Sequence, residues 1–186
     1  MKKLLLLATL VLGVVSCVKD QSLEAGKGGE VDFTLAVELP SDATRAAGAN
    51  SAWGAIDNKI DLTKYDIRYV LCVYDAKGNV AKENIYNYSD ETSTTFPLRL
   101  IAGRDYRFVV WADFVEANHE DLHYNVSDLT NVQIVNNAKQ IAMDESRDAY
   151  TEVATVHNFS NTSVIPTMTL TRPFAKLRVV TDDILE

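Results

Sequence analysis

The residues best spaced for chemistry are two histidines in the second half of the chain. Residues 119–123 read His-Glu-Asp-Leu-His and match the pattern H-E-x-x-H. On a helix, this spacing puts two imidazoles on one face to ligate zinc, while the glutamate activates the metal-bound water of a peptidase. A zinc-peptidase hypothesis therefore needs His119, Glu120 and His123.

The sequence around this motif argues against a catalytic zinc site. Residues 116–118 (Glu-Ala-Asn) lack the apolar side chains that would bury such a helix, and the motif follows a strand-like stretch by only a few residues. A third ligand would have to be Glu145 or Glu152, and neither stands at a recognised spacing. We expect no resident metal and no other cofactor, and keep His119 and His123 only as weak candidates for adventitious binding of a divalent ion.

No other catalytic pattern is present in the sequence. It contains no nucleophile elbow, no Walker A loop and no dinucleotide-binding fingerprint. Cys72 lies in the apolar run 70–74, which favours a small buried hydrophobe over a nucleophile. His157, beside Asn158, is expected to be a surface residue at the end of a strand. The sequence therefore predicts a protein that is not an enzyme.

The composition is that of an acidic globular protein. Of 186 residues, 47% are hydrophobic and 24% are charged, and the formal net charge is −8. A nucleic acid would have to bind against this overall field. Nucleic-acid binding is therefore excluded as the main function.

The N-terminus has the features of an export signal. Two lysines precede an apolar run over residues 4–15, which is short for a membrane span. The run ends in Val14-Val15-Ser16-Cys17, which resembles the lipobox of bacterial lipoproteins. The resemblance implies a signal peptide over residues 1–16 and an acylated Cys17 that anchors the mature chain in outer-membrane lipid. With Cys17 acylated, Cys72 has no partner for a disulfide.

Two polar segments flank the first predicted strand. Residues 17–30 are polar and Gly-rich, which predicts a flexible tether. Residues 41–58 are small, rich in Gly and Ala and aperiodic, with Arg45 as their one basic residue. Such loops are where proteases cut.

Most of the remaining sequence alternates between apolar and polar residues. The clearest case is residues 31–39, in which every second residue is apolar, and this predicts a strand with one face on a core and one in water. Further strands are predicted over residues 65–73, 80–88, 94–100, 105–114, 131–135, 153–157, 163–171 and 174–180, with short helices around residues 115–123 and 138–150.

Turn residues and strand spacing predict the fold class. Residues 75–79 (Asp-Ala-Lys-Gly-Asn) have the turn chemistry of a hairpin, and Pro97 places its strand at a sheet edge or a bulge. Seven to nine short strands with turns about every 8–12 residues favour an all-β antiparallel β-sandwich, because an α/β fold would need a helix after each strand. We expect residues 31–186 to form one such domain.

Together, these features resemble the type V fimbrillin and fimbrillin-like lipoproteins of Gram-negative anaerobes. The matching segments are residues 14–17, 32–37, 43–46, 69–75, 106–113 and 170–178. The resemblance implies a transthyretin-like β-sandwich with a structural role: polymerisation into a surface fibre, the fimbrium or pilus, that serves adhesion.

The resemblance also implies a processing route. In the family, an Arg-specific protease cuts the loop after the first strand, which here corresponds to Arg45 and Ala46. The first strand, residues 31–39, then leaves, and a strand from another subunit fills the groove. Family members normally carry a second β-domain, so this sequence is expected to be either a fragment or a single-domain member.

A second hypothesis is a monomeric surface module that binds a glycan or a host protein. Trp53 and Trp111 on one solvent-exposed face would favour sugar stacking, whereas a covered Trp111 would favour a structural role. The first hypothesis remains a non-enzymatic, lipid-anchored fimbrial subunit at the outer membrane or cell surface, with other subunits as its partners.

Overall fold

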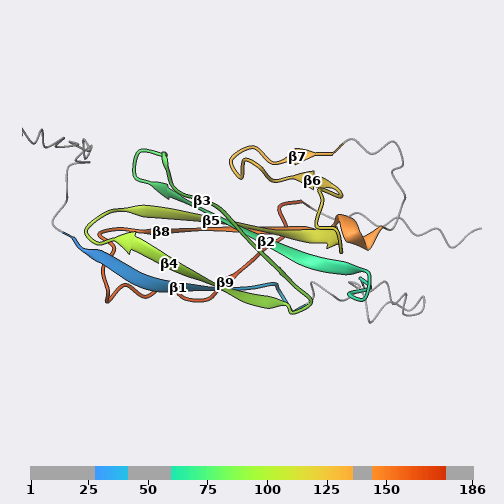
Figure 1. Cartoon of the computed structure of the whole chain (residues 1–186), viewed down its shortest axis with the longest axis horizontal. Coiled ribbons are helices and arrows are strands. Elements are labelled where there is room, and N and C mark those ends of the chain that lie inside the picture. The colour runs from blue at the N-terminus through green and yellow to red at the C-terminus, as the bar shows by residue number, and fades with distance from the viewer. Residues whose placement is uncertain (1–27, 42–59, 136–143, 175–186) are drawn as a thin grey trace, which may run out of the picture.

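Two β-sheets packed face to face make up the computed structural model, which describes residues 28–41, 60–135 and 144–174 (Figure 1). The elements are β1 (Glu30–Glu38), β2 (Tyr65–Asp75), β3 (Val80–Ser89), β4 (Ser93–Ile101), β5 (Tyr106–Glu116), β6 (Tyr124–Asn125), β7 (Gln133–Ile134), the 3-10 helix η1 (Glu145–Arg147), β8 (Ala149–Val156) and β9 (Met168–Thr169). One sheet has the order β4-β1-β9, the other β3-β2-β5-β8, and β6 pairs with β7. All strand pairs are antiparallel except β1 with β9. The predicted all-β antiparallel sandwich is confirmed.

The main core fills the space between the two sheets. Alternate residues of each long strand point inward, as the period of two requires. The largest fully buried side chains of this core include Tyr69, Phe96, Phe108, Phe114 and Tyr150. Burying each of the three phenylalanines stabilises the fold by roughly 1.5–3 kcal/mol relative to an exposed side chain.

The central strands β2 and β5 are buried on both faces. Their outward residues, among them Val70, Cys72 and Trp111, form a second apolar cluster. Residues 124–134, which contain β6 and β7, lie over this face and pack Val126 and Leu129 onto it. We call residues 124–134 the cover segment; in Figure 1 it forms a third layer beside the four-stranded sheet.

The predicted hairpin turn over residues 75–79 and the predicted edge position of Pro97 are both confirmed. In the hairpin between β2 and β3, the Asp75 carboxylate accepts from the backbone N–H groups of Lys77 and Asn79 at 2.8 Å each. Gly78 has a φ of 82°, in the left-handed region that glycine adopts without steric cost. Pro97 lies in β4, an edge strand, where its missing N–H costs no ladder hydrogen bond.

The helix predicted around residues 115–123 is wrong. Val115 and Glu116 continue β5, paired with Asp66 and Tyr65 of β2, and the chain then turns, with His119 at a φ of 60°. The residues after Glu116 are too polar to bury a helix face, so sheet pairing determines the local structure.

Some predicted boundaries near the C-terminus also change. Of residues 138–150, the structure describes 144–150; of these only η1 is helical, and β8 begins at Ala149, earlier than predicted. Of the predicted strand 163–171, Met168–Thr169 forms the two ladder pairs of β9, and Thr171 forms an isolated bridge with Thr151. The two-residue strand β6 was not predicted at all. The strand predicted over residues 174–180 lies outside the described residues except for Phe174, which is not in a strand.

Candidate functional site

The first strand occupies the middle of its sheet. All nine residues of β1 pair antiparallel with β4, from Glu30 opposite Ile101 to Glu38 opposite Ser93. On its other side, β1 pairs in parallel with β9 over two residues. Removing β1 would therefore open a slot between β4 and β9, with unpaired backbone groups on both walls. We call this the β1 slot.

The inward side chains of β1 make the slot apolar. Leu35 and Val37 are fully buried in the core between the sheets. Phe33 is half-buried and contacts Phe159 edge-on, with the ring centroids 5.6 Å apart, and Phe108 at 6.2 Å. These contacts hold β1 in place by burial as well as by its hydrogen bonds.

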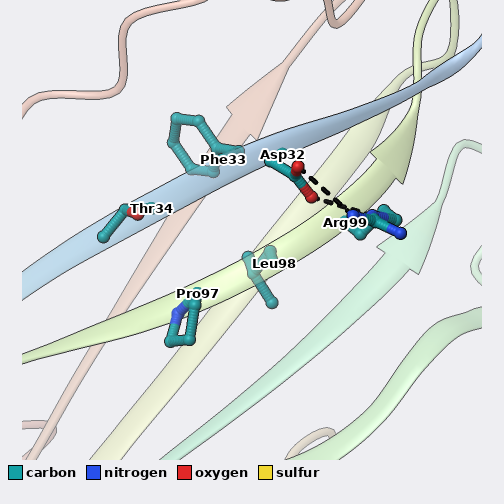
Figure 2. Close-up of a pocket in the computed structure, with 6 residues that line it drawn as sticks. All are labelled: Asp32, Phe33, Thr34, Pro97, Leu98 and Arg99. Carbon is teal, nitrogen blue, oxygen red and sulfur yellow. Dashed lines mark hydrogen bonds and ion pairs between the residues drawn. The ribbon is translucent and has the colours of Figure 1, made fainter.

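The outer face of β1 and β4 carries an open hollow of about 410 Å³, lined by Asp32, Phe33, Thr34, Pro97, Leu98 and Arg99 (Figure 2). Thr34 and Pro97 are directly opposite each other. Arg99 donates to Asp32 across the two strands at 2.8 and 3.3 Å, and this hydrogen bonding with the guanidinium, reinforced by its charge, lowers the pKa of Asp32. Because the ion pair is solvent-exposed, it contributes little to stability. The hollow is open, and its two charged side chains, Asp32 and Arg99, are paired with each other. The strand β1 is therefore a better candidate for a functional element than the hollow.

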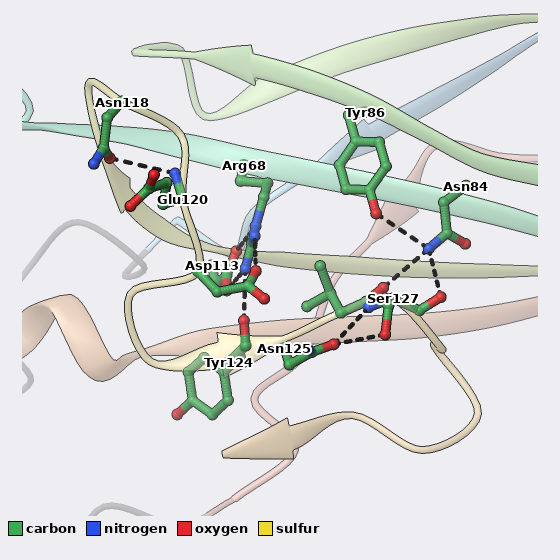
Figure 3. Close-up of polar contacts among 11 residues, drawn as sticks. Arg68, Asn84, Tyr86, Asp113, Asn118, Glu120, Tyr124, Asn125 and Ser127 are labelled. Atoms are coloured by element: carbon green, nitrogen blue, oxygen red, sulfur yellow. Dashed lines mark hydrogen bonds and ion pairs between the residues drawn. The ribbon is translucent and has the colours of Figure 1, made fainter. Parts of the chain in front are cut away.

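A buried ion pair lies under the cover segment, on the outer face of the four-stranded sheet (Figure 3). Arg68 in β2 donates to both carboxylate oxygens of Asp113 in β5, at 2.8 and 2.6 Å. Its remaining donors reach Asp121 Oδ1 at 2.6 Å and the carbonyl oxygen of Tyr124 at 3.0 Å. Arg68 thus joins the sheet to the loop that follows β5 and to the start of the cover segment.

The two charges in this pair shift each other's titration. Burial alone would lower the pKa of Arg68, but the hydrogen bonds and charges of Asp113 and Asp121 outweigh it and raise the pKa. Burial raises the pKa of Asp113, and its contact with Arg68 opposes that shift. A guanidinium whose hydrogen bonds are directed at protein partners is an anchor rather than a free binding group.

Two further contacts fix the cover segment. The Asn84 amide in β3 donates to the carbonyl oxygens of Val126 at 2.9 Å and Ser127 at 3.2 Å. The Tyr124 hydroxyl donates to the carbonyl oxygen of Arg147 at 2.6 Å, and burial raises the pKa of this tyrosine to about 12. No pattern in the sequence predicts either contact.

The two histidines of the H-E-x-x-H motif are held by different elements. His119 Nε2 lies 2.7 Å from an Asp66 oxygen, and the His119 ring stacks on Tyr88 with the centroids 3.8 Å apart. His123 is buried, and its Nε2 lies 2.7 Å from the Ser146 hydroxyl. No helix joins them, and because His123 is buried the two imidazoles do not share one exposed turn.

The proposed third ligands do not complete a metal site. Glu145 lies in η1, and a Glu152 carboxylate oxygen in β8 accepts from the N–H of Val153 at 3.0 Å. Glu120 lies in the loop after β5, where its N–H donates to Asn118 (Figure 3). Within residues 28–41, 60–135 and 144–174, no three His, Cys, Asp or Glu side chains gather closely enough to hold a metal ion.

The remaining candidate residues differ in burial, and four of them lie outside the described residues. Cys72 is a buried free thiol, and burial raises its pKa, as expected of a small hydrophobe. His157 is exposed and pairs with Asp105 at 3.0 Å. Trp111 is only 7% exposed, because the second cluster covers it. Cys17, Arg45, Ala46 and Trp53 lie outside the described residues.

Fold and site together define an all-β sandwich in which β1, the first strand that the structure describes, fills the middle of one sheet. The chain belongs to a family of unknown function, DUF6562, whose model matches residues 24–186. No curated protein and no solved structure gives a significant match. In the part of the chain that the structure describes, no helix is long and apolar enough to cross a bilayer.

Proposed function

We propose that this protein is a non-enzymatic, fimbrillin-like surface lipoprotein that assembles with other subunits by β-strand exchange and serves adhesion. An acylated Cys17 anchors the precursor in the outer membrane. A protease then cuts after Arg45, β1 leaves, and a strand from another subunit enters the β1 slot.

The position of β1 is the observation that carries this proposal. β1 is the first strand among the described residues, so one cut between residues 42 and 59 would separate it covalently from the rest of the described sandwich. It also supplies the central row of backbone pairs in its sheet. A departing β1 would therefore leave an apolar groove flanked by strands, which is the surface that β-augmentation fills.

The alternative of a sugar-binding module has less support. The cover segment and its neighbours bury Trp111, which removes it as a stacking platform. On β3, the ring of Tyr88 stacks on His119 with the centroids 3.8 Å apart, so one of its two faces is covered. Sugar stacking needs a free aromatic face.

Limited digestion with an Arg-specific protease tests the proposal. The chain carrying Cys17→Ser would be cut under native conditions, and the products identified by intact mass. We expect one early cut after Arg45, followed by exchange of the released strand for a fluorescent peptide of residues 30–45. Arg45→Gln is the control and should give neither product. An Arg45 linkage that survives while the chain is cut after other arginines would overturn the processing step.

The native material tests the assembly step. Protein isolated from its outer membrane should contain a species that begins at Ala46 if processing occurs in the cell. A population that consists only of chains with acylated Cys17 would contradict assembly after cleavage and leave a permanently anchored lipoprotein.

A further inference from the structure

The short segment that begins with β9 connects the two sheets. β9 runs parallel to β1 in the three-stranded sheet, and just beyond it Thr171 forms a bridge with Thr151 of β8, in the four-stranded sheet. We call residues 168–172 the strap. In the β1 slot, the strap forms the wall opposite β4.

Two neighbouring amides of the strap bind to different sheets. The N–H of Leu170 donates to the carbonyl oxygen of Glu38, at the end of β1, at 2.8 Å. The next N–H, of Thr171, donates to the carbonyl oxygen of Thr151 at 3.0 Å, and the N–H of Thr151 donates back to Thr171 at 2.8 Å. The first bond is lost when β1 leaves, whereas the reciprocal pair does not involve β1.

Arg172 fixes the end of the strap to the four-stranded sheet. Its Nε and Nη2 lie 3.4 and 3.2 Å from Asp148 Oδ2, and Nη2 also donates to the Tyr150 hydroxyl at 3.1 Å. The guanidinium carbon lies 5.2 Å from the centroid of the Tyr150 ring. Because Tyr150 and Asp148 are buried, these contacts join Arg172 to a rigid part of the fold.

The strap is also held by burial. The side chains of Met168 and Leu170 belong to the main core, and Leu170 is fully buried there. The opposite wall, β4, is joined to β3 by residues 90–92, so it too is tied to the four-stranded sheet. Because β4 and β9 form their ladder pairs with β1 alone, these other connections are what hold the two walls when β1 is absent.

We propose that the strap is the fixed wall of the β1 slot, and that Arg172 is the positioning residue that keeps it on the four-stranded sheet when β1 opens. This inference deepens the proposed function, since a slot is useful for strand exchange only if both walls persist. An incoming strand then meets a preformed groove and need not reorder β9.

Amide hydrogen exchange on the full mature chain carrying Cys17→Ser, followed by NMR, tests the inference. We expect the Leu170 amide to exchange its hydrogen at the rate of the β1 amides. The Thr171 amide should exchange at least tenfold more slowly, at a rate similar to that of the central amides of β2 and β5. Local opening has this signature when one strand separates before the rest. Equal exchange of Leu170 and Thr171 would overturn the inference, whether both follow β1 or both follow global unfolding.

Variants at position 172 test the role of the guanidinium. Arg172→Gln should speed exchange at Thr171 by about tenfold relative to the β2 and β5 amides, and Arg172→Lys should restore part of that protection. Arg99→Gln is the matched control, because it removes an exposed arginine ion pair between β4 and β1 and should leave Thr171 unchanged. Unchanged exchange at Thr171 in Arg172→Gln would remove Arg172 from the role; if that variant does not fold, the comparison of Leu170 with Thr171 in the parent chain decides.

The two proposals fail in different ways. A split between Leu170 and Thr171 without strand exchange after cleavage at Arg45 would overturn the proposed function and leave the fixed wall intact. Strand exchange with equal protection of both amides would overturn the fixed wall and leave the proposed function intact.

Discussion

Arg68 and Asp113 are directly paired across β2 and β5 and form a two-point ion pair beneath the cover segment, with both side chains almost fully buried. Such a pair contributes little to stability when intact, because desolvation offsets the attraction between the charges. Breaking the pair costs much more stability, because one charge then remains buried without its partner.

Removing the Asp113 carboxylate should destabilise the protein strongly. We expect Asp113→Ala to lower the free energy of unfolding by about 3–5 kcal/mol, because Arg68 stays buried and loses its bidentate partner. Urea denaturation followed by tryptophan fluorescence measures this change. The double variant Arg68→Met with Asp113→Leu should regain much of the stability that Asp113→Ala loses.

Asp32→Ala is the control for this prediction. Asp32 also accepts two hydrogen bonds from an arginine, but on the exposed outer face of β1 and β4. Its loss should change the urea midpoint only slightly. Equal destabilisation by the two alanine variants would show that burial of the Arg68 pair is not what matters.

Stability should fall as the pH drops below about 6.5, in part because of His123. Burial lowers the pKa of His123 from its ordinary value of 6.5, an effect that Arg147 reinforces and Asp144 opposes. Ser146 donates to Asp144 at 2.5 Å, so the Ser146 hydroxyl can accept from His123 Nε2, while Nδ1 is buried without a partner. The unfolded chain therefore takes up a proton at a higher pH than the folded one, and acid favours unfolding.

Urea midpoints between pH 8 and pH 5 test this effect. We expect His123→Gln to flatten the decline relative to the parent chain, because glutamine keeps an N–H for Ser146 but does not titrate. The prediction is wrong if the parent and His123→Gln lose stability in parallel.

Zinc should not stabilise this protein through the H-E-x-x-H motif. His123 is buried against Ser146, and His119 is held by Asp66 and Tyr88. We expect the same small change in melting temperature on adding zinc to the parent chain and to His119→Asn, and no stoichiometric metal by elemental analysis. A stoichiometric zinc ion lost in both His119→Asn and His123→Gln would contradict this reading of the site.

The strands with one wet face could be predicted from the sequence, and those buried on both faces only in part. β1 alternates strictly because its outer face meets water, so its bounds were predicted to within one residue. The cover segment left no such periodic pattern, because β6 and β7 have two residues each and Val126 and Leu129 pack from irregular backbone. Short pairings of this kind depend on the surface they cover.

The buried ion pair could not be predicted for a similar reason. Arg68 and Asp113 stand 45 residues apart, and only the register of β2 on β5 brings them together. One signal was available: each is a lone charge inside an otherwise apolar stretch. The histidine motif misled in the opposite direction, because a spacing of four residues implies a helix and β5 instead continues through Glu116.

The last prediction concerns how firmly β1 is held. Leu35 and Thr34 are neighbours on β1, but Leu35 is fully buried in the core, while Thr34 lines the outer hollow. Leu35→Ala should cost about 2–5 kcal/mol through lost burial and the cavity it leaves, and Thr34→Ala should cost much less. In hydrogen exchange, Leu35→Ala should also speed the amides of β1 and Leu170 more than that of Thr171, because the substitution weakens the strand and not the strap. If Leu35→Ala accelerated exchange at Leu170 and Thr171 equally, β1 and the strap would open as one unit.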